Sequence, residues 1–450
     1  MAQTLKSRNS RPPWKIVISA KLASQCRAVA NDVARSLIDG DLLKRNIEAI
    51  EELKEEVVWS APGLTCGIAG LAVMCNILDA CRAGNDFDGR CFEFLQWTAD
   101  AVSESDSDTT LIDASLSDGL AGAALATWQA SNRGRRYREF LSVLDEALHP
   151  MIQAQADNLR TANGVAVSQY DVISGLSGIG RYMLARSHNK AARLSLTHIL
   201  GALISLSREK EGRLGFYTPY ELLDPYAREL YRTGYINCGL AHGVPGPLTL
   251  MALSLRGGIK TPQLAPAIKF LGEWLVNQAI EDQWGINWPT HIPIQDTAAE
   301  PDPVRPTRAA WCYGSPGVAR TLWLAGEATA NAKFKDVAVS AMEAVFRQPI
   351  AVRNIDSSAI CHGVAGLLQI TLRFAVDTGL PQFAVAAEEL VQQLLDMYDP
   401  RCYWGYQQLL PNGHRIDDPS LLCGAAGIVL VLLSASYEVE PDWDQALLIS

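Results

Sequence analysis

Hydrophobic residues in this chain gather in short runs that recur from one end to the other, with stretches of mixed polarity between them. The run from 427 to 434 (GIVLVLLS) is apolar on nearly every side, and a helix of that kind belongs in a protein interior. The stretch from Phe383 to Tyr398 carries Val, Leu and Met on one side and Glu and Gln on the other, as an amphipathic helix does. The pattern predicts inner helices that are fully buried and outer helices that cover them.

A Gly-x-x-Gly step precedes each apolar run. Glycine lets the chain bend sharply and pack closely before a buried helix begins. The spacings between successive copies range from 49 to 71 residues, which leaves room for two helices and their connections in each unit. Seven copies can be identified, and their first glycines are Gly67, Gly119, Gly175, Gly243, Gly314, Gly363 and Gly424.

Seven helical hairpins of this kind predict an all-α fold, an α/α toroid or double-layered barrel with the Gly-x-x-Gly turns at one rim. An open solenoid is the alternative, but it needs polar capping repeats, and the first and last copies here are as apolar as the others. Because no linker interrupts the repeat, we expect one domain over residues 1–450. Residues 1–16, with four basic residues and two prolines, predict a flexible tail, and longer loops are expected at about 208–237 and 282–307.

Charge and composition indicate which binding partners and which cellular compartment to expect. The net charge of −10, with no basic patch, argues against binding of nucleic acid or an anionic membrane. The chain shows neither a signal peptide nor ~18 consecutive apolar residues, so we expect a cytoplasmic protein without a transmembrane segment. Its ten cysteines are then expected to be reduced; four in helix-like stretches are interpreted as buried core residues, namely Cys26, Cys75, Cys81 and Cys91.

Cysteine, histidine and aspartate residues recur at fixed positions before the first glycine of consecutive copies. Cys312 and Cys361 stand two residues before it, His242 and His362 one before it, and Asp171 four before it. Two thiolates and one imidazole fill three positions of tetrahedral zinc and leave one open, which is the catalytic rather than the structural pattern. A thiol that binds the open position would be deprotonated.

Spacing alone leaves alternatives to this zinc site. Cys361 and His362 are adjacent, so they share an ion only if the turn geometry allows it, and all three residues could be ordinary core residues. Cys66 and Cys423 each directly precede a first glycine. Either could supply a fourth ligand, which would make the site structural.

Four segments carry a resemblance to a known family: YDVISGLSG (170–178), GLAHGVPG (239–246), RAAWCYGSPG (308–317) and AICHGVAG (359–366). Together they closely resemble the lanthionine synthetase C-like proteins, the cyclases of lantibiotic biosynthesis, and the resemblance covers residues 60–435. It implies an α/α toroid with one catalytic zinc on the residues that match Cys312, Cys361 and His362. It also implies the addition of a peptide cysteine thiol to a dehydroalanine or dehydrobutyrine in a precursor peptide, which forms a thioether ring.

The resemblance also assigns residues to the steps of this reaction. Imidazole suits proton transfer near neutral pH, and His242 matches the family's catalytic histidine, the acid that protonates the enolate. Arg308 matches a family arginine placed to stabilise the developing oxyanion. Asp171 could orient His242, relay a proton or hold the substrate amide, and these roles stay open. Trp311 and Tyr313 shape the pocket or simply pack.

Outside the repeat phase the sequence gives weaker indications. The remaining histidines are interpreted as surface or structural residues: His149, His188, His198, His291 and His414. Two long stretches rich in aromatic residues and proline, from Gly215 and from Asp282, could form the walls of a peptide groove or could be ordinary loop packing.

The expected substrate is a dehydrated precursor peptide with its leader, and a lantibiotic dehydratase and an exporter are candidate partners that would place the chain at the membrane periphery. A zinc protein of the same family that binds glutathione in a regulatory role is the alternative function. A toroid enzyme of another class, a zinc prenyltransferase or a glycosidase, is less favoured. Glycoside hydrolysis needs a pair of carboxylates, and only Asp171 lies in phase.

Overall fold

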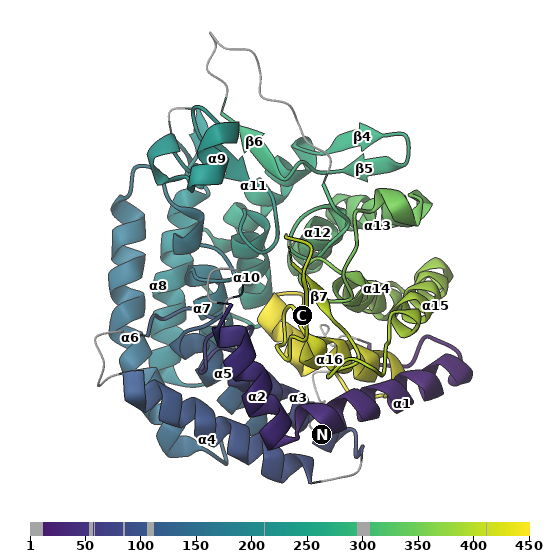
Figure 1. Ribbon diagram of the computed structural model, residues 1–450. Helices are drawn as coiled ribbons and strands as arrows, with labels where there is room; N and C mark the ends of the chain where they lie inside the picture. The colour runs from purple at the N-terminus through teal and green to yellow at the C-terminus, as the bar shows by residue number, and fades with distance from the viewer. Residues whose placement is uncertain are drawn as a thin grey trace, which may run out of the picture.

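The computed structural model describes residues 12–53, 57, 59–83, 86–105, 112–210, 212–294, 307–410 and 412–450. Within these ranges the helices form two concentric layers around a common centre (Figure 1). The inner layer consists of α3 (Ile68–Ala80), α5 (Leu120–Ala130), α7 (Leu176–Ala185), α10 (Pro245–Arg256), α12 (Ser315–Thr329), α14 (Val364–Thr378) and α16 (Ala425–Ser436). The outer layer consists of α1 (Ala20–Leu37), α4 (Phe87–Ser105), α6 (Arg138–Thr161), α8 (Lys190–Leu206), α11 (Leu264–Asn277), α13 (Ala332–Arg347) and α15 (Pro381–Asp396).

The inner layer is a closed ring. Each inner helix packs against the next one in chain order, and α16 packs against α3. Each of the first six inner helices pairs with the outer helix that follows it, whereas the last one, α16, pairs with α1 from the other end of the chain. The predicted α/α toroid is therefore confirmed, and the seventh hairpin is completed by the N-terminal helix.

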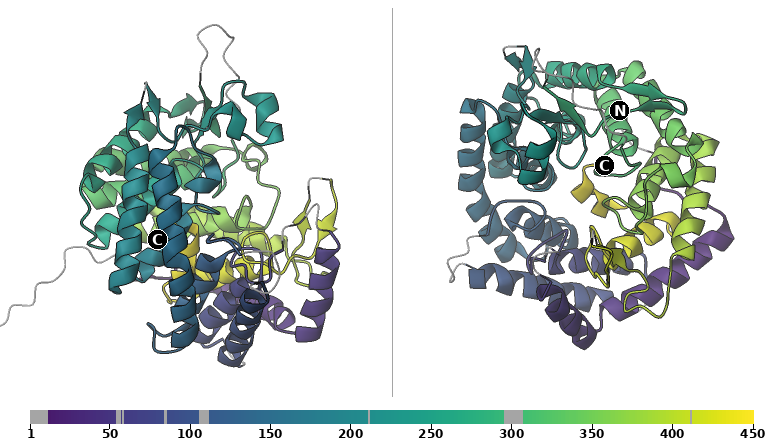
Figure 2. Two further views of the ribbon diagram at one scale, coloured as in Figure 1. Left: turned by 90° about the vertical axis from the view of Figure 1, so that its left-hand side faces the viewer. Right: turned by 45° about the horizontal axis from the view of Figure 1, so that its top comes forward.

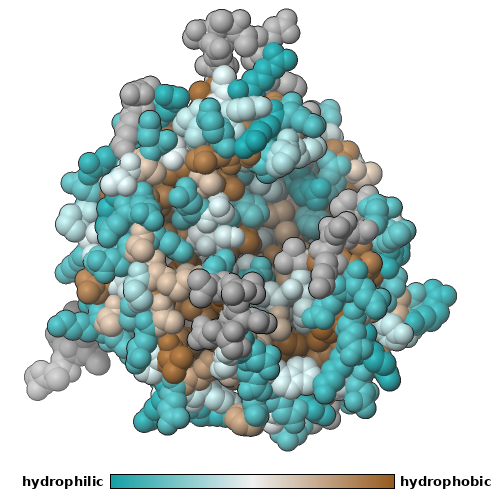
Figure 3. Space-filling view, turned by 60° about the vertical axis from the view of Figure 1, so that its left-hand side comes forward, coloured by the Kyte–Doolittle hydropathy of each residue, from teal (hydrophilic) through white to brown (hydrophobic). Residues whose placement is uncertain are grey.

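The two classes of helix differ in burial as the hydrophobic pattern predicts. Every residue of α16 is buried, whereas α15 buries only one face, which includes Phe383, Leu390 and Leu394. An apolar surface all round suits a helix with neighbours on all sides, and a single apolar stripe suits one that faces solvent. The face of the molecule in Figure 3 accordingly carries mostly hydrophilic side chains, with hydrophobic patches and a hollow among them.

Glycines hold the turns that precede the inner helices. Gly314 is the N-cap of α12 at φ +95°, a backbone conformation that favours glycine, and a Cβ there would lie 1.9 Å from the carbonyl oxygen of Arg308. At position 317, inside the first turn of α12, glycine is required for a different reason. A Cβ on it would lie 2.8 Å from Cβ of Leu240 in the preceding unit, so the missing side chain lets neighbouring units approach closely.

Backbone hydrogen bonds join these turns to one another around the whole ring. The N–H of Val172 donates to the carbonyl of Ala241 at 2.9 Å, and the N–H of Ala241 donates to that of Cys312 at 3.3 Å. The series continues from Cys312 to Cys361 at 3.2 Å, from Cys361 to Leu422 at 3.0 Å, from Leu422 to Thr65 at 2.9 Å, from Leu64 to Ser117 at 2.7 Å and from Ser117 to Ile173 at 3.0 Å. We call this series the turn belt; it sets side chains from consecutive units beside one another.

The centre of the ring is filled by the C-terminal segment, which the tilted view of Figure 2 shows inside the circle of helices. This segment includes the 3-10 helix η4 (Asp442–Leu447). Its carbonyl groups accept hydrogen bonds from the ring, from Trp311 Nε1 to Leu447 at 3.0 Å and from Arg320 Nε to Ile449 at 2.7 Å. Trp311 is 1% exposed, so its role is packing beneath the turn that carries Cys312.

Short strands and one further helix lie in the long connections. The strands pair antiparallel, β3 (Tyr235–Asn237) with β6 (His291–Pro293) and β4 (Ile280–Asp282) with β5 (Gly285–Asn287). Two other pairs are β1 (Glu209–Lys210) with β2 (Arg213–Leu214), and β7 (Gln408–Leu409) with β8 (Arg415–Ile416). The helix α9 (Pro225–Leu230) lies in the connection between units three and four, and α2 (Gly40–Glu51) follows α1. The remaining 3-10 helices are η1 (Val167–Gln169), η2 (Tyr220–Leu222) and η3 (Ile350–Val352).

The predicted flexible tail differs from the structure where it can be compared. Residues 1–11 lie outside the described ranges, but Trp14 is 6% exposed and its Nε1 donates to the carbonyl of Ser434 at 2.9 Å. The guanidinium of Arg373 lies 4.8 Å from the centre of its ring. The charge pattern of the first residues concealed this aromatic anchor. No helix among the described residues has both the length and the apolar composition needed to cross a bilayer.

Candidate functional site

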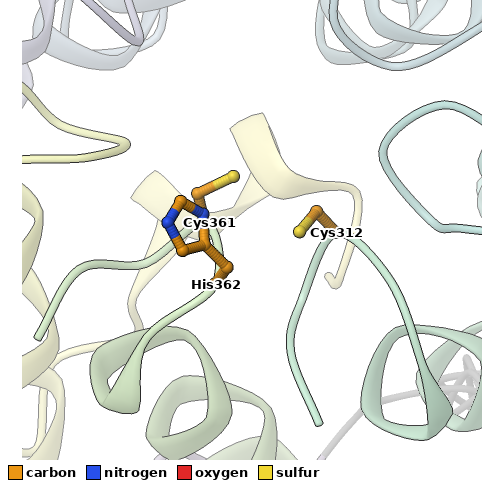
Figure 4. Close-up of side chains that lie close together, drawn as sticks. All are labelled: Cys312, Cys361 and His362. Carbon is orange, nitrogen blue, oxygen red and sulfur yellow. The ribbon is translucent and has the colours of Figure 1, made fainter. Parts of the chain in front are cut away.

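Cys312, Cys361 and His362 meet where the turns of units five and six lie side by side. Their ligand atoms, two Sγ and one imidazole nitrogen, all lie within 4.8 Å of one another. The two thiols point into the same space between the turns, with the imidazole of His362 beside them (Figure 4). The hydrogen bond from the N–H of Cys312 to the carbonyl of Cys361, at 3.2 Å, fixes the two turns relative to each other.

Adjacent residues Cys361 and His362 both reach this space because the segment from 360 to 362 is a turn rather than a helix or strand. Regular structure would direct neighbouring side chains differently. The turn is held tightly, since a Cβ on Gly363 would lie 2.4 Å from the carbonyl oxygen of Ser357. This turn therefore allows two adjacent residues, Cys361 and His362, to face the same metal site.

The surroundings of the cluster favour the metal-binding forms of Cys312 and His362 and the protonated thiol of Cys361. A hydrogen bond from the thiol of Cys361 lowers the pKa of Cys312, and the charges of Arg308 and His242 lower it further against the effect of burial. The same hydrogen bond raises the pKa of Cys361. Burial and the charge of Arg308 lower the pKa of His362, so its imidazole stays neutral, as a metal ligand must.

These residues fit the donor set of a zinc ion. In a tetrahedral site, thiolate and imidazole donors at ~2.3 and ~2.0 Å from zinc lie roughly 3.5 to 3.8 Å apart. The donor atoms here lie within 4.8 Å of one another, which exceeds those separations by about 1 Å at most. The structure thus brings together a Cys-Cys-His cluster that can hold a metal ion.

Cys423 and Cys66, the candidates for a fourth ligand, lie farther along the same row of turns. Hydrogen bonds with Cys312 and then with Cys423 raise the pKa of Cys361; burial, and after it the charge of Cys423, raises that of Cys66. Neither belongs to the group of mutually close donor atoms found among the described residues. Three protein donors are favoured over four.

His242 and Asp171 form a second pair at the rim. Nδ1 of His242 lies 2.7 Å from Oδ2 of Asp171, and the other carboxylate oxygen accepts the backbone N–H groups of Ser174 and Gly175 at 2.8 Å each. Because a carboxylate accepts, the proton lies on Nδ1 of His242, and Nε2 is left for other partners. Of the three roles open for Asp171, this contact supports orientation of the imidazole.

Burial lowers the pKa of His242, but the hydrogen bond and the charge of Asp171 raise it by more, so the net pKa lies above the ordinary value. Arg308 is exposed and acts on the cluster through its charge, which lowers the pKa of both Cys312 and His362. His242 and Arg308 thus both precede Cys312 in sequence, and the charge of each lowers its pKa.

A cavity of about 470 Å³ opens beside His242. Tyr313 and His242 contribute to it from the rim, and Tyr231, Tyr235 and His291 contribute from the two long connections. Both aromatic-rich stretches therefore do form walls next to the rim, as one of the two sequence interpretations expected.

His291 differs from the expectation that it is a surface or merely structural residue, because it lines this cavity. Its ring lies 4.2 Å from that of Tyr235 and 5.2 Å from that of Tyr231, measured between centroids. Burial lowers its pKa to about 4. Its position outside the repeat phase hid it in the sequence; the one available signal was the aromatic and proline content of the segment around it.

The other cysteines agree with the sequence interpretation. Cys26, Cys75, Cys81 and Cys91 are buried on the helical units, and all ten cysteines are free thiols. Burial raises the pKa of Cys26, of Cys81 and of Cys91 to about 12 in each case. These thiols are core residues without nucleophilic character.

Comparison with known proteins gives matches over nearly the whole chain. Residues 58–448 match the family described as Lanthionine synthetase C-like protein. The nisin biosynthesis protein NisC of Lactococcus lactis subsp. lactis is 25% identical over 431 residues, which cover 92% of this chain and 97% of the relative. Among solved structures, a nisin cyclase superposes with a TM-score of 0.72 at 24% identity and covers 90% of this chain and 97% of its own.

Proposed function

This chain belongs to the lanthionine synthetase C-like family, and we propose that it is a lanthionine cyclase. Its substrate is a dehydrated lantibiotic precursor peptide, whose cysteine thiols are added to dehydroalanine or dehydrobutyrine residues. The observation that carries this proposal is the meeting of Cys312, Cys361 and His362 within 4.8 Å in the turn belt that also holds His242. The names of the relatives, a nisin biosynthesis protein and a nisin cyclase, support the same reaction.

Cys312, Cys361 and His362 are the residues that would hold a catalytic zinc ion. Zinc with three protein ligands supplies a position at which a substrate thiol is bound and deprotonated. The protein contributes the lowered pKa of Cys312 and the neutral imidazole of His362, and its turns fix the donors relative to each other. A free cysteine, by contrast, is only a few per cent thiolate near neutral pH.

His242 is the general acid. The substrate sulfur forms a bond to the β-carbon of the dehydro residue, and the electrons of the double bond move to the α-carbon and the amide oxygen as an enolate. His242 donates a proton to the α-carbon from Nε2, while Asp171 holds Nδ1 and stabilises the charged ring. The raised pKa of His242 keeps a protonated fraction available near neutral pH.

Arg308 stabilises the enolate oxygen, because a cation placed where negative charge develops lowers the barrier. Overall the thiol loses one proton and the α-carbon gains one. No atom enters or leaves the peptide, so the reaction needs no oxidant, reductant or leaving group. It needs a peptide that is already dehydrated, so an enzyme that removes water from serine and threonine must act first.

We further infer that the chain works with that dehydratase and with an exporter of the product, at the cytoplasmic face of the membrane. This inference rests on the order of the chemistry, since a reactive dehydro peptide is best passed directly between enzymes. Co-purification from cells that express the three proteins would test it. Recovery of the chain alone would count against a stable assembly.

The central experiment is cyclisation in vitro. The zinc-loaded protein is incubated with a dehydrated precursor peptide, and free thiols are then alkylated and counted by mass spectrometry. We expect the thiol count to fall to zero with no change in peptide mass before alkylation. Thiols that stay fully alkylatable would contradict the proposal, and binding of glutathione under the same conditions would point to the regulatory alternative.

A further inference from the structure

Among the residues that line the cavity beside His242, the ionisable groups other than tyrosines are Asp224, His242 and His291, and His291 is neutral. Asn237 sets this up, because its Oδ1 accepts the backbone N–H of Gly239 at 2.9 Å, which turns Nδ2 toward the cavity. From there Nδ2 donates to Nε2 of His291 and to the hydroxyl of Tyr313, each at 3.1 Å. An amide nitrogen cannot accept, so Nε2 of His291 carries no proton.

The proton of His291 is therefore on Nδ1, which lies 3.3 Å from the hydroxyl of Tyr231. The low pKa of about 4 keeps this imidazole neutral at physiological pH. Burial raises the pKa of Tyr235 to about 12, so this phenol is also uncharged, and the hydroxyl of Tyr313 is engaged by the hydrogen bond from Asn237. The wall thus presents neutral rings whose polar atoms are largely engaged with one another.

The carboxylate among the lining residues is that of Asp224, an exposed residue that caps α9 by accepting the N–H of Ala227 at 2.9 Å. The carboxylate of Asp171 lies behind His242. The charge of Asp224 opposes an acidic ligand, whereas the charge of Asp171 is offset by His242 when that imidazole is protonated. A charged group of either sign would also lose its hydration on entering walls of this kind.

The cavity is continuous with the proposed reaction centre. His242 is at once a lining residue and the proposed acid, and Tyr313, which follows Cys312 in sequence, lines it as well. Its volume of about 470 Å³ is in the usual range of ligand sites. Residues along an extended peptide are about 3.3 Å apart, so the side chain next to the α-carbon that His242 protonates would reach this space.

We propose that this cavity is a subsite for an uncharged apolar or aromatic side chain adjacent to the dehydrated residue of the peptide, and that it discriminates against acidic side chains there. The proposal rests on the proposed cyclase function and goes beyond it by assigning a preference to the substrate sequence. Tyr231, Tyr235 and His291 are then specificity-determining residues, and they take no part in proton transfer.

The wall formed by α9 offers a way to change this preference without disturbing the toroid. Leu223, Ala227, Tyr231 and Tyr235 form a small hydrophobic cluster that is separate from the main core, and Leu230 packs against it. Leu230 is half-buried and lines the cavity. Leu222 belongs to the same connection, is 47% exposed and is not among the lining residues, so Leu222→Glu is a matched control for Leu230→Glu.

The test uses short peptides with one dehydroalanine and one cysteine, in which the residue before or after the dehydroalanine is Leu, Glu or Lys. For the wild type we expect kcat/KM to favour Leu over Glu by at least about tenfold at one of the two positions, the size of effect that a single pocket contact produces. Leu230→Glu should lower the value for the Leu peptide and raise that for the Lys peptide, while Leu222→Glu should keep the wild-type order.

Two results would overturn the subsite while leaving the cyclase function intact: equal kcat/KM for the Leu, Glu and Lys peptides at both positions, or a change in Leu222→Glu as large as that in Leu230→Glu. Cyclisation of none of the peptides, nor of a full-length dehydrated precursor, would overturn the cyclase function and the subsite together. As a measurement independent of chemistry, fluorescence anisotropy with labelled peptides that carry Ala for dehydroalanine and Ser for Cys should show the same order in Kd.

Discussion

Asp171 and His242 lie 71 residues apart in the chain, yet Oδ2 of the first and Nδ1 of the second are separated by 2.7 Å. The turn belt explains the distance, because the residue after Asp171 donates its N–H to the residue before His242, from Val172 to Ala241, at 2.9 Å. The carboxylate is 2% exposed and the imidazole 36% exposed. The pair is therefore rigid on the aspartate side and open toward the cavity on the histidine side.

Asp171→Asn should change the pH dependence of cyclisation as well as its rate. Asp171 raises the pKa of His242, and a general acid loses activity as the pH rises through its pKa, so the alkaline fall of kcat should begin at a lower pH in the variant. We expect kcat to fall by roughly 10²-fold near neutral pH. The measurement is a kcat–pH profile with a model peptide.

The control for that variant is Asp145→Asn on α6, which removes another buried carboxylate, the partner of Arg186 at 2.5 Å and of Tyr182 at 2.6 Å. This change should lower stability without moving the alkaline limb of the profile. An unmoved limb in Asp171→Asn would contradict the role given to Asp171.

Substitution of the proposed ligands should abolish zinc binding. Cys312→Ser, Cys361→Ser and His362→Gln each remove one of three donors, and two protein donors hold zinc weakly. Metal analysis after dialysis should find one zinc per chain in the wild type and little in these variants. Cys423→Ser tests the fourth-ligand alternative, since the Cys423 thiol hydrogen-bonds that of Cys361 but lies outside the group of mutually close donors, and it should keep the wild-type stoichiometry. Loss of zinc in Cys423→Ser would indicate a structural four-ligand site.

Arg308→Ala should lower kcat with a smaller effect on KM, because the guanidinium is proposed to stabilise charge that develops only after the thiol attacks. Removal of one such group typically costs roughly 10²-fold in kcat. Steady-state kinetics with a model peptide measures both constants. Arg401→Ala, which removes an arginine that is 88% exposed and pairs with Asp399, should leave both unchanged. An effect of Arg308→Ala confined to KM would assign this residue to peptide binding.

His291 should make the protein sensitive to mild acid. Its pKa falls from 6.5 to about 4 on burial, so between these values the unfolded chain binds a proton that the folded chain does not. Stability is therefore lost as the pH falls through this window, by about 3 kcal/mol for one group. Urea unfolding at several pH values should show this loss in the wild type and in His414→Gln, whose histidine is exposed, and a smaller loss in His291→Gln. An equal loss of stability with falling pH in the wild type and both variants would contradict a neutral buried imidazole.

Asp444 should be essential for stability, because it is a buried charge at the centre of the ring. It is fully buried, and both oxygens accept from Arg373, at 2.7 and 2.9 Å. Asp444→Ala leaves the guanidinium of Arg373 without this partner, and breaking such a pair costs about 3–5 kcal/mol. Denaturant unfolding measures the change. Asp399→Ala, at the surface pair with Arg401, should have no measurable effect, and a similar small effect for Asp444→Ala would contradict the prediction.

The sequence by itself determined the layers, the repeat and the phase of the rim residues. An all-round apolar run such as that of α16 has one stable environment, an interior, and the repeated Gly-x-x-Gly step marks each place where an inner helix begins. Residues at equal distances before those glycines, such as Cys312 and Cys361, are therefore placed at one rim by the sequence pattern itself. Local pattern carries this information because it reports burial and chain reversal.

Only the tertiary structure decided which side chains touch across units and which residues from the long connections join them. The turn at 360–362 lets adjacent residues Cys361 and His362 face one space, α1 closes the ring on α16, and Trp14 anchors a segment that its charges predicted to be loose. His291 reaches the cavity because its strand, β6, pairs with β3 and sets His291 opposite Asn237. These two residues are 54 positions apart in the sequence. Such contacts depend on non-local pairing and on side-chain packing, and neither of these produces a periodic pattern in the sequence.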